Sequence, residues 1–201
     1  TGKFDALINF SFRQNVMNRS SLPDTYDYMA KTLRSEKDFN VLSYISSHDD
    51  ALYTRSDLIN GGNYLLLAPG AVQIYYGDET QRQRQWKDLS ANDLTLRSDM
   101  NWNSINQKVL KHWQTVGCFR NRHPAVGAGK QTILSRSPVV FARVYSSGKD
   151  TDRIIVALAD AKKAVSISTK SIFKDGETVR NAYDGSTAVV KNQTVTFQSG
   201  E

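Results

Sequence analysis

Short apolar runs alternate with longer periodic segments over about the first 125 residues. The runs at residues 4–10, 39–45 and 71–76 are typical of buried strands. Between and after them, apolar side chains recur at three- and four-residue steps, which is the spacing of one helix face. These segments predict helices over residues 21–36, 56–68 and 104–123. Strands separated by helices favour a parallel sheet with right-handed crossovers.

Residues that favour helix ends support these limits. Pro23 lies in the first turn of the first predicted helix, where its missing N–H is tolerated. Ser104 is expected to cap the third helix and Pro124 to end it. Gly61 and Gly62 fall inside the second helix and lower its propensity, so its limits are less well defined.

The pattern changes after about Gly129, where β-rich runs follow one another with glycines and no helix between them. These runs are residues 139–145, 153–158, 164–167, 187–190 and 194–197. Such a series predicts a small antiparallel β-sandwich. We therefore expect two domains, residues 1–126 and residues 127–201.

Composition is that of a folded protein. With 201 residues, 39% hydrophobic and 23% charged, the chain is long enough for one domain or for one and a part. The net charge of +6 invites a nucleic-acid reading, but the basic residues are spread along the chain, which favours an ordinary solvated surface. The single cysteine, Cys118, excludes an internal disulfide and is expected to be a buried thiol on the third helix.

No membrane or export segment is expected in the chain. No apolar run approaches the length of about 18 residues that a spanning helix needs. The first ten residues lack the positive head and apolar core of a signal peptide.

The candidate chemistry lies where the strand at residues 39–45 ends. The chain continues there through two serines to His48 and Asp49. The carboxyl ends of strands are where α/β barrels carry their catalytic residues. A carboxylate can stabilise developing positive charge, and an imidazole can donate to a substrate hydroxyl. The other interpretation is a helix-entry cap and an ordinary surface pair, and these residues alone leave both open.

Three stretches in order extend this observation. They are YISSHD at residues 44–49, LLLAPGAVQIYYGDE at residues 65–79, and RSDMNW at residues 97–102 with FRNRHP at residues 119–124. Taken together they resemble the α-amylase family of glycoside hydrolases, which are (β/α)8-barrel enzymes that cleave α-glucans. The stretches SSHD, APGAVQI and HPAVGAGKQ are most similar to the bacterial periplasmic members of that family.

The resemblance implies a fold class of α/β plus all-β. Residues 1–126 would be the C-terminal part of the catalytic (β/α)8 (TIM) barrel, with its last three βα units and strands six, seven and eight at residues 4–10, 39–45 and 71–76. Residues 127–201 would be the family's terminal antiparallel β domain. Barrels of this type have about 250 residues, so the barrel would be incomplete.

The resemblance also implies an activity, the hydrolysis of α-1,4-glucosidic bonds of starch or maltodextrins with retention of configuration. Asp49 would be the third carboxylate, which stabilises the transition state, and His48 would bind substrate. Retaining enzymes need two further carboxyl groups about 5 Å apart. By position, the nucleophilic Asp and the acid/base Glu would precede Thr1. The chain alone is therefore expected to be inactive.

Further expectations follow from the same resemblance. The partner would be an α-glucan rather than nucleic acid or a membrane, and the location periplasmic or secreted. No metal or cofactor is expected in this chain, because the calcium of the family would lie in the upstream part. Open sheet edges favour self-association. The alternative function is a non-catalytic glucan-binding or scaffold protein that shares the fold.

Several positions depart from the family pattern or are ambiguous. The family often has an arginine two residues after His-Asp, but here Asp50 and an alanine follow, so either Arg55 takes that role or nothing does. Asp78 and Glu79 are interpreted as structural or loop-anchoring rather than as a catalytic pair. Trp86 and Trp102 would either stack on sugar rings or pack within their loop.

Overall fold

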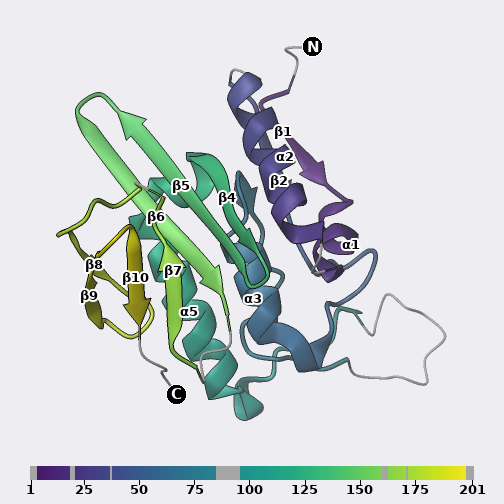
Figure 1. Ribbon diagram of the computed structural model, residues 1–201. Helices are drawn as coiled ribbons and strands as arrows, with labels where there is room; N and C mark the ends of the chain where they lie inside the picture. Colours follow the sequence, from purple (N-terminus) through teal and green to yellow (C-terminus); the bar gives the residue numbers. More distant parts are fainter. Residues whose placement is uncertain are drawn as a thin grey trace.

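The computed structural model describes residues 4–18, 21–36, 38–84, 96–159, 163–170 and 172–197. It has mixed helix and sheet, with helices beside a parallel sheet in the first part and antiparallel sheets in the second (Figure 1). The elements of the first part are β1 (Ala6–Asn9), α1 (Phe12–Met17), α2 (Leu22–Ser35), β2 (Asn40–Ser43), η2 (Arg55–Asp57), α3 (Leu58–Leu66), β3 (Ala71–Val72), η3 (Trp102–Ser104), α5 (Gln107–Arg122) and α6 (Pro124–Ala128).

The first three strands confirm the predicted parallel sheet. Its order is β1-β2-β3, with Ala6 opposite Asn40 and Leu42 opposite Ala71. β3 is shorter than the predicted run at residues 71–76, because only Ala71–Val72 pair as a strand. One more ladder-like bond follows, from Gln73 N to Ser43 O at 2.8 Å, before the chain turns.

Every strand pair of the second part is antiparallel, as predicted. β4 (Lys130–Arg136), β5 (Val139–Ser147) and β6 (Asp150–Leu158) form one sheet; β7 (Val165–Ser168) pairs with β10 (Thr194–Phe197), and β8 (Thr178–Arg180) pairs with β9 (Thr187–Val189). β4 and β8 were not predicted, because their sequences KQTILSR and TVR contain few apolar residues.

The two glycines of α3 allow close packing. A Cβ on Gly62 would lie 2.9–3.2 Å from the Trp113 indole of α5, and one on Gly61 would lie 2.9–3.0 Å from Tyr53 and Ile45. The Trp113 Nε1 also donates to the Leu58 carbonyl at 2.8 Å. The lost helix propensity is therefore offset by tight contact between α3 and its neighbours.

Two predictions about α5 were wrong. The helix begins after Asn106, whose side-chain oxygen accepts from the backbone N–H groups of Lys108 and Val109, while Ser104 belongs to a short 3₁₀ turn. Both residue types are good caps, so the sequence did not separate them. Cys118 is exposed rather than buried, because it lies on the solvent side of α5.

The hydrophobic core crosses the predicted domain boundary. Phe12 and Tyr26 belong to the same buried cluster as Phe141, Ile154 and Val156. The rings of Tyr26 and Phe141 meet edge to face at 5.5 Å. The division into residues 1–126 and 127–201 stays a prediction, but the two parts share one core.

A buried arginine joins the two parts. Arg143 of β5 is fully buried, and its Nη1 donates to the carbonyls of Leu67 (2.7 Å) and Val126 (2.5 Å). Its Nε and Nη2 donate to the side-chain oxygen of Gln131 at 3.0 and 2.9 Å. Burial lowers the pKa of Arg143 to about 9, so the guanidinium is still charged at neutral pH.

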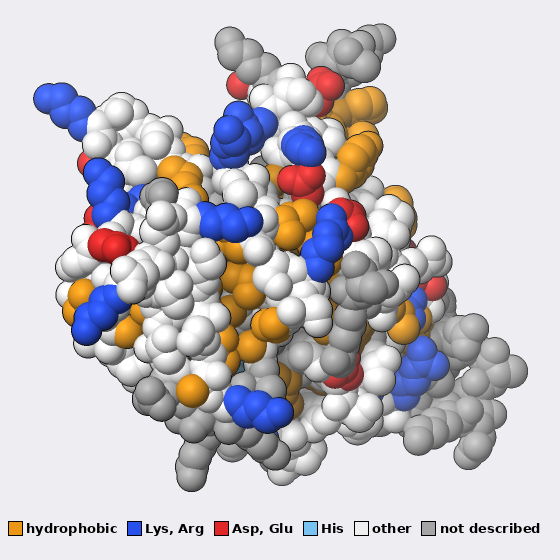
Figure 2. Space-filling model, viewed as in Figure 1, with side chains coloured by type: hydrophobic (Ala, Val, Ile, Leu, Met, Phe, Trp, Pro, Cys, Tyr) orange, Lys and Arg blue, Asp and Glu red, His pale blue; other side chains and the backbone are white. Residues whose placement is uncertain are grey.

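Apolar side chains reach the surface around β1. Phe4, Leu7, Ile8 and Phe10 are each at least half exposed, and orange surface is visible near the N-terminus in Figure 2. β1 pairs only with β2 among the described residues. This surface fits the expected self-association, which stays a prediction. In the part of the chain that the structure describes, no helix is long and apolar enough to cross a membrane.

Candidate functional site

His48 and Asp49 lie beyond the carboxyl end of β2, the central strand of the parallel sheet. The buried residues 44–47 carry the chain from β2 to the surface, where the two side chains are 52% and 73% exposed. The location confirms that this pair follows the carboxyl end of a strand.

Asp49 contacts three residues through its carboxylate and its backbone N–H. Its Oδ1 lies 3.1 Å from the His48 Nε2 and 3.5 Å from the Arg97 Nη2. Its backbone N–H donates to the Ser47 hydroxyl at 3.4 Å, and the N–H of Asp50 donates to the same hydroxyl at 3.1 Å. The result is an exposed, oriented carboxylate that can accept hydroxyl hydrogen bonds or stabilise positive charge.

Arg97 is held in place by a buried arginine. Arg82, which is 1% exposed, donates to the carbonyls of Leu96 and Ser98, both at 3.1 Å. The hydroxyl groups of Tyr75 and Tyr76 donate to the same two carbonyls, at 3.1 and 2.9 Å respectively. Leu96 and Ser98 are buried, whereas Arg97 between them is exposed.

Arg55 does not contact Asp49. Its Nη2 donates to Asp78 at 2.7 Å and to the Ser46 hydroxyl at 2.9 Å, and the Ser46 hydroxyl donates to Asp78 at 2.8 Å. Asp78 is fully buried, and burial raises its pKa although Arg55 and Ser46 oppose the shift. This group ties the exit of β2 to the exit of β3.

Glu79 faces a different partner, because its Oε2 accepts from the backbone N–H of Gly77 at 3.0 Å. The two adjacent carboxylates thus have the anchoring contacts that were expected of them. On the other side of β2, Asp50 pairs with Arg13 of α1 at 2.8 Å. The helix that follows β1 and the loop that follows β3 therefore both reach the segment that follows β2.

The two roles expected for the tryptophans were stacking on sugar rings and packing within their loop. Trp102 lies in η3 and is 73% exposed, so its ring is accessible, and no contact with the Asp49 side chain is shown. Trp86 lies outside the described residues. The sequence analysis assigned no role to Arg97, Arg82 or Arg13. Sequence alone does not distinguish an exposed arginine from one that binds a carboxylate or backbone carbonyls.

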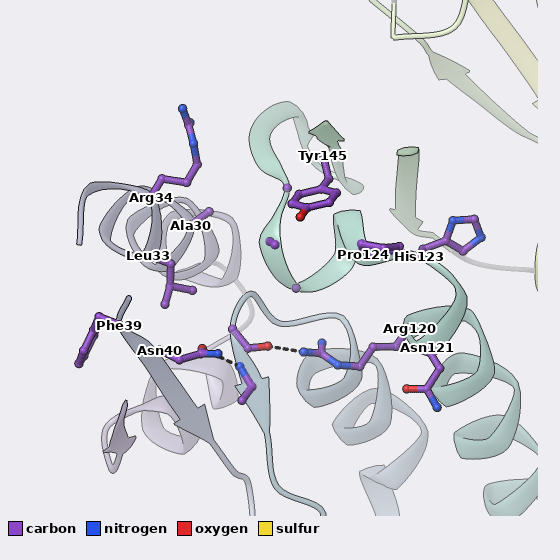
Figure 3. Close-up of a pocket in the computed structure, with 15 residues that line it drawn as sticks. Ala30, Leu33, Arg34, Phe39, Asn40, Arg120, Asn121, His123, Pro124 and Tyr145 are labelled. Carbon is purple, nitrogen blue, oxygen red and sulfur yellow. Dashed lines mark hydrogen bonds between the residues drawn. The ribbon is translucent and has the colours of Figure 1, made fainter. Parts of the chain in front are cut away.

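A cavity of about 510 Å³ lies at the opposite end of the sheet, where β2 and β3 begin (Figure 3). Leu33 of α2 and Tyr145 of β5 lie on either side of it. Arg120 donates there to the carbonyls of Leu66 and Ala68, at 2.9 and 2.8 Å, and to that of Gly70. Because Asp49 follows the other end of β2, this cavity is separate from the candidate site.

Within the described ranges, no three His, Cys, Asp or Glu side chains gather closely enough to hold a metal ion.

Comparison with known proteins gives one relative by sequence. The chain is 44% identical over 155 residues to the periplasmic alpha-amylase of Escherichia coli (strain K12). The match covers 73% of this chain but only 22% of that protein, of which this chain corresponds to a C-terminal portion. No protein-family model matches.

Solved structures share the fold. The alpha-amylase of Geobacillus thermoleovorans, complexed with acarbose, aligns with a TM-score of 0.72 at 16% identity, over 96% of this chain and 45% of its own. AmyP in complex with maltose aligns with a TM-score of 0.65 at 12% identity, over 96% of this chain and 47% of its own. The chain spans less than half of each.

Proposed function

We infer that this chain supplies one side of a glucan-cleaving cleft. It belongs to the α-amylase family of glycoside hydrolases and corresponds to a C-terminal portion of its relative. The single observation that carries the proposal is the exposed, oriented Asp49 carboxylate beyond the end of the central parallel strand. The whole enzyme would hydrolyse α-1,4-glucosidic bonds of starch or maltodextrins with retention of configuration.

The fold assignment rests on topology. We assign β1, β2 and β3 as the last three strands of a (β/α)8 barrel, and the antiparallel sheets after Lys130 as a terminal β-sandwich domain. The parallel order β1-β2-β3 and the candidate site at the carboxyl ends are what a barrel of this kind requires. The edges of β1 and β3 that have no partner strand among the described residues would then pair with strands of an upstream part.

The chemistry divides between the two parts. An Asp and a Glu of the upstream part would serve as nucleophile and acid/base, about 5 Å apart. Asp49 would stabilise the positive charge that develops at the sugar ring, and His48 would donate to a substrate hydroxyl. This chain alone would hold the substrate poorly and cut nothing.

Support for the substrate class comes from the relatives, which are named alpha-amylases or hold maltose. The name of the Escherichia coli protein supports a periplasmic or secreted location. Any calcium of the family would be held by the upstream part.

The test is hydrolysis of maltoheptaose by the full-length protein that contains this chain. Asp49→Asn should lower kcat by about 10²–10³-fold, the size seen when one charge-stabilising group is removed. Asp50→Asn, a neighbouring carboxylate that pairs with Arg13, is the matched control and should stay near wild type. Full activity of Asp49→Asn, or clear turnover by the isolated chain, would overturn the assignment. Binding of maltoheptaose without turnover would favour the non-catalytic alternative.

A further inference from the structure

We propose that Arg97 is a positioning residue for Asp49. The inference rests on the proposed function, because it names how the supporting carboxylate is held. It concerns a residue for which the sequence offered no role.

The direct observation is a shared oxygen. The Arg97 Nη2 and the His48 Nε2 both reach the Oδ1 of Asp49, at 3.5 and 3.1 Å. Two nitrogen atoms that converge on one oxygen restrict rotation of the carboxyl group.

The other arginines near this edge are already engaged. Arg55 is committed to Asp78 and Ser46, and both of these partners are fully buried. Arg13 pairs with Asp50 at 2.8 Å. Of these three arginines, Arg97 is the one that contacts the Asp49 carboxylate.

The backbone that carries Arg97 is fixed, which is what a positioning role requires. The Arg82 guanidinium lies 4.0 Å from the centre of the Tyr76 ring and binds the carbonyls on both sides of Arg97. The Ser98 hydroxyl accepts from the same guanidinium and donates to the Gln83 carbonyl at 3.1 Å. Leu96 and Ser98 are buried, whereas the Arg97 side chain between them is exposed and its Nη2 reaches the Asp49 carboxylate.

The consequence is a link between two loops. Asp49 follows β2, and Arg97 belongs to the segment beyond β3, so the pair sets the position of the carboxylate relative to the neighbouring strand exit. In an exposed setting such a pair adds little to folding stability. Its effect should instead be on the geometry of the reacting groups, where small displacements strongly affect rate.

The experiment uses the full-length protein that contains this chain, with maltoheptaose as substrate. Arg97→Ala should lower kcat by about 10- to 100-fold with little change in KM, the pattern of an interaction that matters in the transition state. Arg97→Lys should recover part of the loss. Added guanidinium ion, below denaturing concentration, should partly restore Arg97→Ala but not Asp49→Asn. Arg13→Ala removes the same charge from the adjacent pair and should remain within about twofold of wild type.

Each outcome decides the proposal. Wild-type kcat in Arg97→Ala, an equal loss in Arg13→Ala, or a loss that appears only in KM would overturn it. A loss in Arg97→Ala with neither lysine recovery nor guanidinium rescue would indicate a merely structural role and would also overturn it. If the unmodified full-length protein does not hydrolyse maltoheptaose, the proposed function itself fails, and that result is distinct from an active enzyme that is indifferent to Arg97.

Discussion

The buried guanidinium of Arg143 should be one of the larger single contributions to the stability of the chain. In Arg143→Leu, the carbonyls of Leu67 and Val126 and the side-chain oxygen of Gln131 would lose their donor inside the core. Each unsatisfied buried acceptor costs about 1–3 kcal/mol. Relief of the desolvated charge offsets part of this sum, so we expect a net loss of about 3–5 kcal/mol, as for other broken buried polar groups.

Urea denaturation followed by the fluorescence of the tryptophans, among them the buried Trp113, measures this difference. The matched control is Arg136→Leu, which breaks a bidentate pair with Asp24 in which both side chains are about 60% exposed. That variant should lose far less stability than Arg143→Leu, because an exposed ion pair is screened by water and contributes little. If Arg143→Leu does not fold, Arg143→Lys keeps the charge without the planar fork and should lie between it and wild type. Equal stabilities for Arg143→Leu and Arg136→Leu would refute the reasoning.

Two further predictions concern the packing of helices and the effect of pH. Gly62→Ala should destabilise the chain by about 1–3 kcal/mol, because the added Cβ would press on the Trp113 ring. Gly117→Ala is the control: it has open space around it and should stabilise the chain by up to about 1 kcal/mol through its higher helix propensity. Thermal unfolding compares the two variants. Burial lowers the pKa of His112 below 6.5, so as the pH falls the unfolded chain binds a proton before the folded chain does. The free energy of unfolding should therefore decrease below about pH 6.5, by at most about 1.4 kcal/mol per pH unit. His112→Gln should flatten this slope in urea titrations, and an unchanged slope would assign the effect to other groups.

The parallel sheet could be predicted because its determinants are local. Apolar runs form β1 and β2, and α2 has its proline in the first turn. β3 was overestimated because Tyr75 and Tyr76, which continue the apolar run, leave the ladder to bind carbonyls about twenty residues later. Periodicity carries no information about such distant partners.

The candidate site was predictable only in part, for a related reason. The position of Asp49 follows from a strand and its end, but its neighbour Arg97 comes from another loop. Arg82 and Arg143 could not be predicted as buried, because arginine is usually exposed. Their burial is tolerated only where the fold gathers several carbonyl oxygens around each guanidinium.

The shared core limits how the β-rich part could be exchanged between related enzymes by recombination. Phe141, Ile154 and Val156 of the β-rich part complete the cluster that contains Phe12 and Tyr26. A recombination breakpoint near residue 127 would expose matching apolar faces on both products. The β-rich part is therefore not an exchangeable module. A productive exchange between related enzymes would have to transfer it together with the helical face on which it rests.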